Sequence, residues 1–127
     1  MLRKNIKDLR PDINSIRNTK GTQQTELFQN DVLRPILKYQ NNLLIKVYQQ
    51  YLKIHKFNIQ NKSSAEFETF VLKSFNKDKS LKNFILGLII GLLTEAEYEL
   101  FKTSEKEYKR RILNMSRERV LDQLKNN

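Results

Sequence analysis

The chain has 127 residues, of which 39% are hydrophobic and 30% are charged, and this composition suits one globular domain rather than two. The absence of cysteine excludes disulfide frameworks, thiolate zinc sites and thiol catalysis, and the single histidine excludes any site that needs two imidazoles. Twenty-four lysine and arginine residues against fourteen acidic residues give a net charge of +10, which favours phosphates, anionic membranes or acidic proteins as partners.

Residues 1–24 are predicted to form a basic, partly helical arm, separate from a helical bundle domain over residues 25–127. Pro11 interrupts the arm, and the polar stretch around Gly21 ends it. We expect the arm to dock on its own bundle or on a neighbouring subunit. A frayed tail is the alternative, and an anionic membrane surface is less favoured. The apolar seam that supports this docking recurs at helical spacing: Leu2, Ile6, Leu9, Ile13 and Ile16.

A long helix is predicted from Thr25 to about Phe57. Thr25 is a suitable N-cap residue, and Pro35 is expected to kink the early turns. His55 near the end is expected to be a partly buried imidazole rather than a metal ligand. Two apolar stripes widen the buried face of this helix: Phe28, Val32, Ile36, Tyr39, Leu43 and Val47, beside Leu33, Leu37, Leu44, Tyr48, Tyr51 and His55.

Four further helices are predicted after this one. One begins at Asp78 or Ser80 and runs through residues 81–93. No segment alternates cleanly between apolar and polar residues, so no strand is expected. The sequence therefore predicts an all-α fold, a single bundle of about five helices. The other three starts show the capping-box pattern, a hydroxyl residue with a glutamate three positions later: Ser63 with Glu66, Thr94 with Glu97, and Ser104 with Glu107.

The helix over residues 81–93 is predicted to be the centre of the bundle. Residues 84–93 are apolar on every side, so neighbouring helices are expected to surround them. Gly87 and Gly91 lie on one face, and each costs about 1 kcal/mol of helix propensity relative to alanine, so close helix packing is expected there. The element packed on the glycines is a second helix of this chain, a second copy of the chain, or a ligand.

No catalytic motif is evident, and no catalytic residue, cofactor or metal ligand is predicted. Glu-x-x-His and His-Glu-x-x-His patterns are absent, and no serine stands on a glycine-flanked turn. The acids of residues 95–107 are explained by helix caps and by i,i+4 ion pairs. Two such pairs are expected, Glu105 with Lys109 and Glu107 with Arg111.

Basic residues provide the main functional indication. No acidic residue occurs between Val32 and Ala65, and the lysines of this window fall on one solvated face of the predicted helix. A second basic stripe follows the last helix. Such stripes can neutralise nucleic-acid phosphates or acidic protein surfaces, although lysine is also ordinary solubilising surface. The candidate contact residues are Lys38, Lys46, Lys53 and Lys56 on the first stripe, and Lys106, Arg110 and Arg117 on the second.

Four segments carry a family resemblance: residues 28–41 (FQNDVLRPILKYQN), 89–91 (IIG), 94–98 (TEAEY) and 110–115 (RRILNM). Together they resemble a group of short, all-helical bacterial proteins of unknown function that often bear an automatic "glyoxalase" label. The resemblance covers about residues 25 to 125. It implies a helical fold and no functional residues. Metal-dependent glyoxalases use a βαβββ fold with His and Glu ligands, whereas this sequence offers neither strands nor enough histidine.

These features predict a non-catalytic, intracellular protein-binding domain that self-associates. A nucleic-acid-binding protein that uses the two basic stripes is the alternative, and a small-molecule enzyme is the third possibility. No apolar leader occurs within residues 1–21, and the longest apolar run has ten residues, about half of a membrane-spanning helix. A cytoplasmic location without a transmembrane segment is therefore expected.

Overall fold

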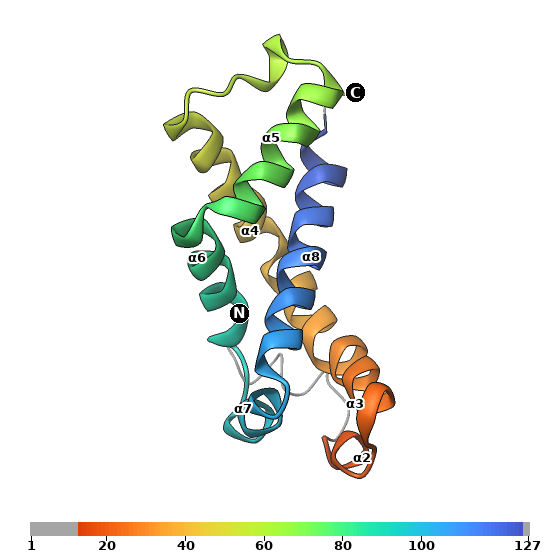
Figure 1. The fold of residues 1–127 in the computed structure, drawn as a ribbon. Coiled ribbons are helices and arrows are strands. Elements are labelled where there is room, and N and C mark those ends of the chain that lie inside the picture. The colour runs from red at the N-terminus through yellow and green to blue at the C-terminus, as the bar shows by residue number, and fades with distance from the viewer. Residues whose placement is uncertain (1–12, 126–127) are drawn as a thin grey trace.

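The computed structural model describes residues 13–125, which contain helices and turns but no strand (Figure 1). The predicted all-α bundle is confirmed, and six helices of the described range, α3 to α8, have eight or more residues, against the predicted number of about five. The helices in chain order are α2 (Asn14–Arg17), α3 (Gly21–Phe28), a π-helical segment η1 (Gln29–Leu33), α4 (Arg34–Ile54), a 3₁₀ segment η2 (Ile59–Asn61), α5 (Ser64–Lys77), α6 (Lys79–Ile90), α7 (Glu95–Lys102) and α8 (Glu105–Leu124).

The first long helix begins at Gly21, so the prediction that Thr25 is its N-cap is wrong. Lys20 is the N-cap residue, and Gly21 has a φ of 67°, a left-handed conformation that glycine adopts without a Cβ clash. The Thr25 hydroxyl instead donates to the carbonyl oxygen of Gly21, at 3.3 Å. The boundary predicted between residues 24 and 25 therefore falls inside α3.

Residues from the predicted arm belong to the core of the bundle. The Ile16 side chain is fully buried, in the same apolar cluster as Phe28, and Ile13 packs against that cluster. The docking of the seam on its own bundle is confirmed for these two isoleucines. The rest of the seam, within residues 1–12, lies outside the described residues.

The predicted distortion at Pro35 is present as the π-helical segment η1, which directly precedes α4. Proline lacks the N–H that would bond to the carbonyl of the residue four before it, and a wider turn accommodates that loss. The helix ends at Ile54 rather than Phe57. Lys56 has a φ of 56°, in the left-handed region. The N–H of Phe57 donates to the carbonyl oxygen of Leu52 at 2.9 Å, and this combination terminates the helix.

Two of the three predicted capping boxes are confirmed. The Ser63 hydroxyl accepts the Glu66 N–H at 3.1 Å, while the Glu66 carboxylate accepts the Ser63 N–H at 2.8 Å. The same reciprocal pair joins Thr94 and Glu97 at the start of α7. Asp78 rather than Ser80 caps α6, because the Asp78 carboxylate accepts the N–H of Leu81. These caps fix where α5, α6 and α7 begin.

The predicted capping box at Ser104 is wrong. Ser104 is the N-cap residue of α8, but its side chain accepts no backbone hydrogen bond. The Glu107 carboxylate binds the guanidinium groups of Arg110 and Arg111 instead, with the shortest N···O distances at 2.6 and 2.7 Å. Two charged donors compete more strongly for a carboxylate than one backbone N–H does.

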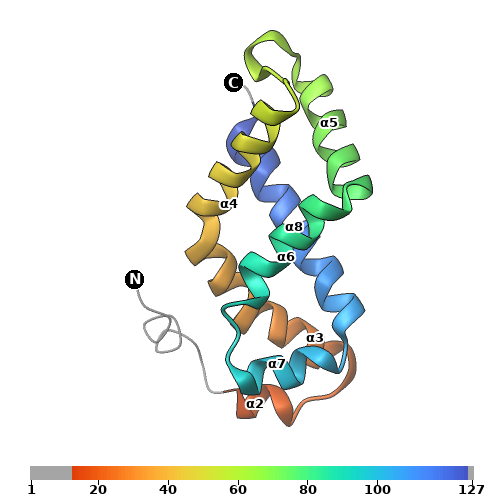
Figure 2. The same cartoon turned by 90° about the vertical axis from the view of Figure 1, so that its left-hand side faces the viewer.

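The core consists of two apolar clusters, and α8 runs through both. Helix α8 contacts α4, α5, α6 and α7 and extends along most of the molecule (Figures 1 and 2). The lower cluster contains Phe28, Phe101, Tyr108 and Ile112, and the upper cluster contains Leu44, Tyr48, Phe67, Ile85 and Val120. Helix α8 presents a narrow buried stripe with a repeat of four residues: Tyr108, Ile112, Ser116 and Val120.

The expectation that α6 is enclosed on all sides is wrong. One face of α6 is buried through Leu81, Ile85 and Ile89, but 57% of the Phe84 side chain is exposed. The central position belongs to α8, a helix with a polar composition. The apolar sequence of α6 therefore belongs to a helix with one exposed face, and not to the central helix of the bundle.

No neighbouring helix of the described chain packs closely on the α6 glycines. A Cβ added at Gly87 would meet no atom within 4 Å, and one at Gly91 would meet the carbonyl oxygen of Gly87 at 2.9 Å. Close packing by another helix of the same chain is therefore wrong for the described residues. Contact of Gly87 and Gly91 with a second copy or a ligand stays a prediction.

Candidate functional site

Helices α4 and α6 lie side by side in the bundle (Figure 2). An apolar groove lies between them. Its volume is about 470 Å³. The two helices run antiparallel on either side of it. We call this surface the α4/α6 groove, and its lining residues are Lys46, Val47, Gln50, Tyr51, Ile54 and His55 from α4 and its C-terminus, with Asp78, Ser80, Leu81 and Phe84 from the start of α6.

Two side-chain hydrogen bonds hold α4 and α6 together. Near one end, the Gln40 side-chain amide donates to the carbonyl oxygen of Leu88 at 2.9 Å. At the other end, the Tyr51 hydroxyl donates to the Asp78 carboxylate at 2.7 Å. These contacts join residues 48 and 27 positions apart in the sequence. The two bonds therefore connect α4 and α6 at two levels along their length.

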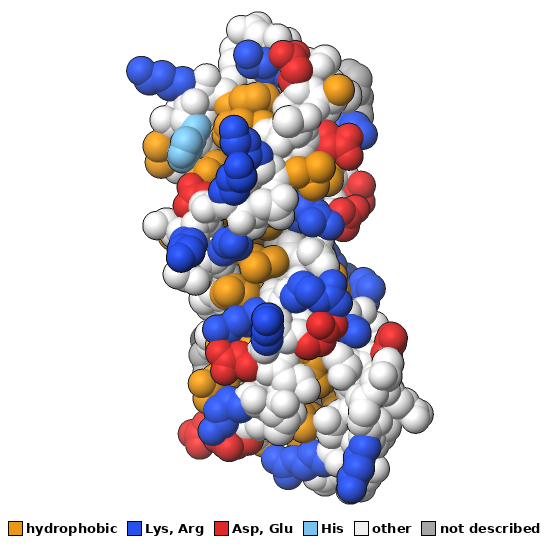
Figure 3. Space-filling model, in the orientation of Figure 1, with side chains coloured by type: hydrophobic (Ala, Val, Ile, Leu, Met, Phe, Trp, Pro, Cys, Tyr) orange, Lys and Arg blue, Asp and Glu red, His pale blue; other side chains and the backbone are white. Residues whose placement is uncertain are grey.

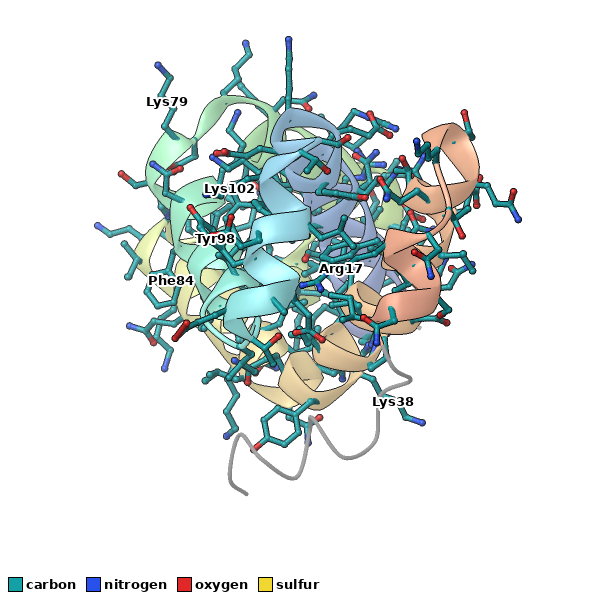
Figure 4. The ribbon with its side chains drawn as sticks, turned by 90° about the horizontal axis from the view of Figure 1, so that it is seen from below. Arg17, Lys38, Lys79, Phe84, Tyr98 and Lys102 are labelled. Atoms are coloured by element: carbon teal, nitrogen blue, oxygen red, sulfur yellow. The ribbon has the colours of Figure 1, made fainter. Side chains whose placement is uncertain are left out.

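Three large apolar side chains on this face are exposed. The exposed fraction is 65% for Ile54, 57% for Phe84 and 46% for Leu43. Leu43 lies one helical turn before Val47 on the same side of α4. Because Leu43 is exposed, the prediction that it is buried is wrong. Figure 4 shows Phe84 at the outer edge of the bundle. The face is an apolar surface that no described element covers.

Acidic charge is nearly absent from the groove. Asp78 is the one acidic residue in its lining, and that carboxylate already accepts hydrogen bonds from the Tyr51 hydroxyl and the Leu81 N–H. These bonds lower the pKa of Asp78, with the Tyr51 contact as the largest cause. Burial and the neighbouring carboxylate raise the pKa of Tyr51. Lys46 adds a cation to the lining.

Replacing Tyr51 with phenylalanine should raise the pKa of Asp78, because the carboxylate loses its hydroxyl donor. Because the pKa of Asp78 is lower in the folded state, the ionised carboxylate stabilises the fold at pH values above the ordinary aspartate pKa. This stabilisation is lost as the pH falls through the lower, folded-state pKa. Below about pH 4, the free energy of unfolding should therefore fall less steeply with decreasing pH in the variant than in the unmodified chain. NMR titration of the Asp78 carboxyl carbon measures this shift, and an unchanged pKa would show that the hydrogen bond is absent in solution.

The four predicted lysines of the first basic stripe are exposed. Lys38, Lys46 and Lys53 lie along α4, and Lys56 follows its C-terminus in the left-handed conformation. Lys38 lies on a different side of the bundle from Phe84 in the view from below (Figure 4). The predicted solvated position of these lysines is confirmed. Their contact with nucleic acid stays a prediction.

The second basic stripe carries its own counter-charges. Arg110 binds Glu107 at 2.6 Å, and Arg117 lies 3.4 Å from Glu118, whereas Lys106 is exposed. The two arginines near Glu107 lower its pKa to about 2, and that carboxylate raises the pKa of Arg110. Two predicted ion pairs are confirmed, both at 2.7 Å: Glu105 with Lys109 and Glu107 with Arg111.

His55 is the C-cap residue of α4, and its side chain is exposed rather than partly buried. The imidazole Nδ1 lies 2.9 Å from the carbonyl oxygen of Tyr51, and the two ring centroids are 4.1 Å apart. Within residues 13–125, no group of three or more His, Asp or Glu side chains is arranged to hold a metal ion. The ring contacts of His55 with Tyr51 and Phe70 place it in an aromatic cluster.

A polar network between α4 and α8 escaped the sequence prediction. The Asn41 side-chain oxygen accepts from Arg119 at 3.0 Å and from Gln123 at 2.7 Å. Burial, followed by the nearby Arg34 charge, lowers the pKa of Arg119. Asn41 is 78 residues from Arg119 in the sequence, and no local spacing indicates such a pairing.

Comparison with known protein families, curated proteins and solved structures finds no match to this chain. No helix of the described range combines the length and the apolar character that crossing a bilayer requires.

Proposed function

We propose that this chain is a non-catalytic protein-binding domain whose α4/α6 groove binds an amphipathic helix with acidic flanks. The observation that supports the proposal is the exposed apolar face of Leu43, Ile54 and Phe84, on a surface with one acidic side chain. A cytoplasmic location, self-association and membership of the "glyoxalase"-labelled helical group stay predictions.

The dimensions of the groove suit a helical ligand. Leu43, Val47 and Ile54 lie on one side of α4, and the eleven steps from Leu43 to Ile54 correspond to about 16 Å along the helix axis. This length equals about three helical turns of a bound segment. Amphipathic helices bind such grooves through apolar residues at positions i, i+3 or i+4, and i+7. Burying the exposed apolar area would contribute roughly 25 cal/mol per Å².

Charge indicates an acidic partner. Lys46 lines the groove, and α4 contains no acidic residue. A second copy docked through the same face would bring its own Lys46 and acid-free α4 against those of the first copy. The one carboxylate of each groove, Asp78, already accepts two hydrogen bonds. The chain's own residues 1–12 carry four basic residues against two acidic ones, so they offer little charge complementarity either. Glutamate residues beside an apolar stripe would pair with the lysine and add selectivity.

The test uses the full chain and a synthetic helical peptide with leucine at groove-facing positions and glutamate on both flanks. We expect the peptide to bind with an affinity that fluorescence anisotropy can measure, and Ile54→Asp or Phe84→Asp to weaken it by on the order of tenfold or more. Leu72→Asp is the matched control, because Leu72 is also an exposed apolar residue but lies outside the groove lining. The control should bind like the unmodified chain.

Three results would overturn the proposal. The first is the absence of peptide binding, and the second is equal binding of a peptide in which lysine replaces every glutamate. The third is a dimer, measured by light scattering after gel filtration, that Ile54→Asp dissociates. That last result would show that a second copy, rather than an acidic helix, occupies the groove.

A further inference from the structure

A second cavity lies next to the α4/α6 groove and shares part of its wall. Its volume is about 650 Å³, within the range of small-molecule sites. The side chains of Tyr51 and Asp78, joined by their hydrogen bond, border both spaces. We call it the cationic cavity, and three helices contribute its lining: Tyr51, His55, Phe70, Lys73, Ser74, Lys77, Asp78, Lys79 and Ser80.

Three lysines are among the lining residues of this cavity. Lys73 and Lys77 are one turn apart on α5, and Lys79 is the first residue of α6. None of the three forms an ion pair with an acidic group of the described residues. Figure 3 shows basic side chains beside the single histidine on this face. Three lysines in one lining give this part of the surface an excess of positive charge, which a bound anion would reduce.

The acidic residue in the lining does not neutralise these lysines. The Asp78 carboxylate accepts the Tyr51 hydroxyl at 2.7 Å and the Leu81 N–H at 3.1 Å. Both bonds hold it at the junction between α5 and α6, where it also caps α6. The cavity therefore keeps a net positive charge, which favours a ligand with more than one negative charge.

Aromatic rings also belong to the lining of this cavity. The His55 ring lies over Tyr51 at a centroid distance of 4.1 Å and meets Phe70 edge-on at 6.4 Å. Tyr51 and Phe70 are 6.1 Å apart. The His55 side chain is exposed, so a planar group entering the cavity can contact this cluster. Rings of this kind bind nucleobases through stacking, which contributes about 1–3 kcal/mol per base.

We propose that the cationic cavity binds a nucleotide. The lysine side chains of Lys73, Lys77 and Lys79 would contact the phosphates, and the base would lie against the ring cluster of His55 and Phe70. Lysine is a common phosphate ligand in proteins, because its ammonium carries three donors on a flexible stem. The lysines Lys73 and Lys77 belong to the cavity alone, whereas His55 lines both the cavity and the groove. The phosphate-binding part of the site therefore does not depend on the proposed helix-binding function.

Calorimetric titration of the full chain with three probes tests the two parts of the site. ATP carries both the charge and the ring, inorganic triphosphate carries the charge alone, and adenosine carries the ring alone. We expect ATP to bind with the highest affinity, triphosphate to bind at least about threefold more weakly, and adenosine to show no measurable binding. ATP affinity should fall as the salt concentration rises, because the lysines are exposed.

A pair of charge-matched variants separates a site from general electrostatic attraction. Lys73→Ala with Lys77→Ala should weaken ATP binding by about tenfold or more. Lys38→Ala with Lys53→Ala removes the same charge from exposed positions outside the cavity and should change the affinity less than about twofold. All four positions are exposed, so both variants should fold, and thermal unfolding checks this.

The outcomes separate this proposal from the one on the groove. The absence of ATP binding, or an equal loss in both double variants, would overturn the nucleotide site. Triphosphate binding as tight as ATP binding would overturn the contact between the base and the ring cluster. Phe84→Ala adds no charge and lies outside the cavity lining, so it should leave ATP affinity unchanged, whatever it does to helix binding.

Discussion

Replacing Phe28 with alanine should lower the free energy of unfolding by about 3–5 kcal/mol. Phe28 is fully buried at the end of α3, and its ring centroid lies 4.5 Å from that of Tyr108 on α8. The substitution leaves a cavity where the N-terminal helices meet the core. A typical domain has a total stability of about 5–15 kcal/mol, so this loss is a large part of it. Urea unfolding measures the change.

Phe84→Ala is the matched control, because it removes the same atoms from an exposed position. With 57% of its side chain already in contact with water, Phe84 should contribute about 1 kcal/mol or less to stability. Equal losses in the two variants would show that Phe84 is covered and that the α4/α6 groove is closed. A small loss at Phe28 would show that residues 13–33 do not belong to the cooperative core.

Local patterns predicted the features whose partners are close in sequence. The capping boxes at Ser63 and Thr94 need two residues three positions apart, and both formed. The same pattern failed at Ser104, because Glu107 had stronger partners one turn further along α8. A local rule holds where no charged group competes for the same carboxylate.

Composition predicted the type of each helix better than its position in the fold. Residues 84–93 are apolar enough for a central helix, yet α6 leaves Phe84 and Gly87 uncovered. A sequence pattern shows that a side chain is apolar but not whether the covering surface belongs to the same chain. The polar helix α8 fills the centre with one buried residue per turn, which is a weak pattern in the sequence.

The candidate sites depend on contacts between distant elements. Helical spacing identified the exposed lysines of α4, because one helix face is a local property. The cationic cavity instead combines His55, Lys73 and Lys79 from three elements, and the Tyr51–Asp78 bond that borders it spans 27 residues. The direction in which α5 meets α6 determines this arrangement. No periodicity within one segment contains that information.

The junction between the two apolar clusters depends on a small residue of α8. Ser116 is fully buried and lies one turn after Ile112 of the lower cluster and one turn before Val120 of the upper cluster. Its hydroxyl has no hydrogen-bond partner among the described residues. A buried hydroxyl without a partner is destabilising, so the small volume of the side chain explains serine better than its polarity does.

Ser116→Leu should therefore lower the free energy of unfolding by about 1–3 kcal/mol, because the larger side chain forces neighbouring helices apart. Ser116→Ala removes the unpaired hydroxyl and keeps the volume small, so stability should stay equal or rise by up to about 1 kcal/mol. Urea unfolding measures the free energy of unfolding of both variants, which should change in opposite directions. Stabilisation by leucine would reveal a void between the clusters, and a large loss with alanine would show that the Ser116 hydroxyl forms a hydrogen bond in solution. Since α8 contacts α4, α5, α6 and α7, a shift at this position would also change the spacing that defines the groove and the cavity.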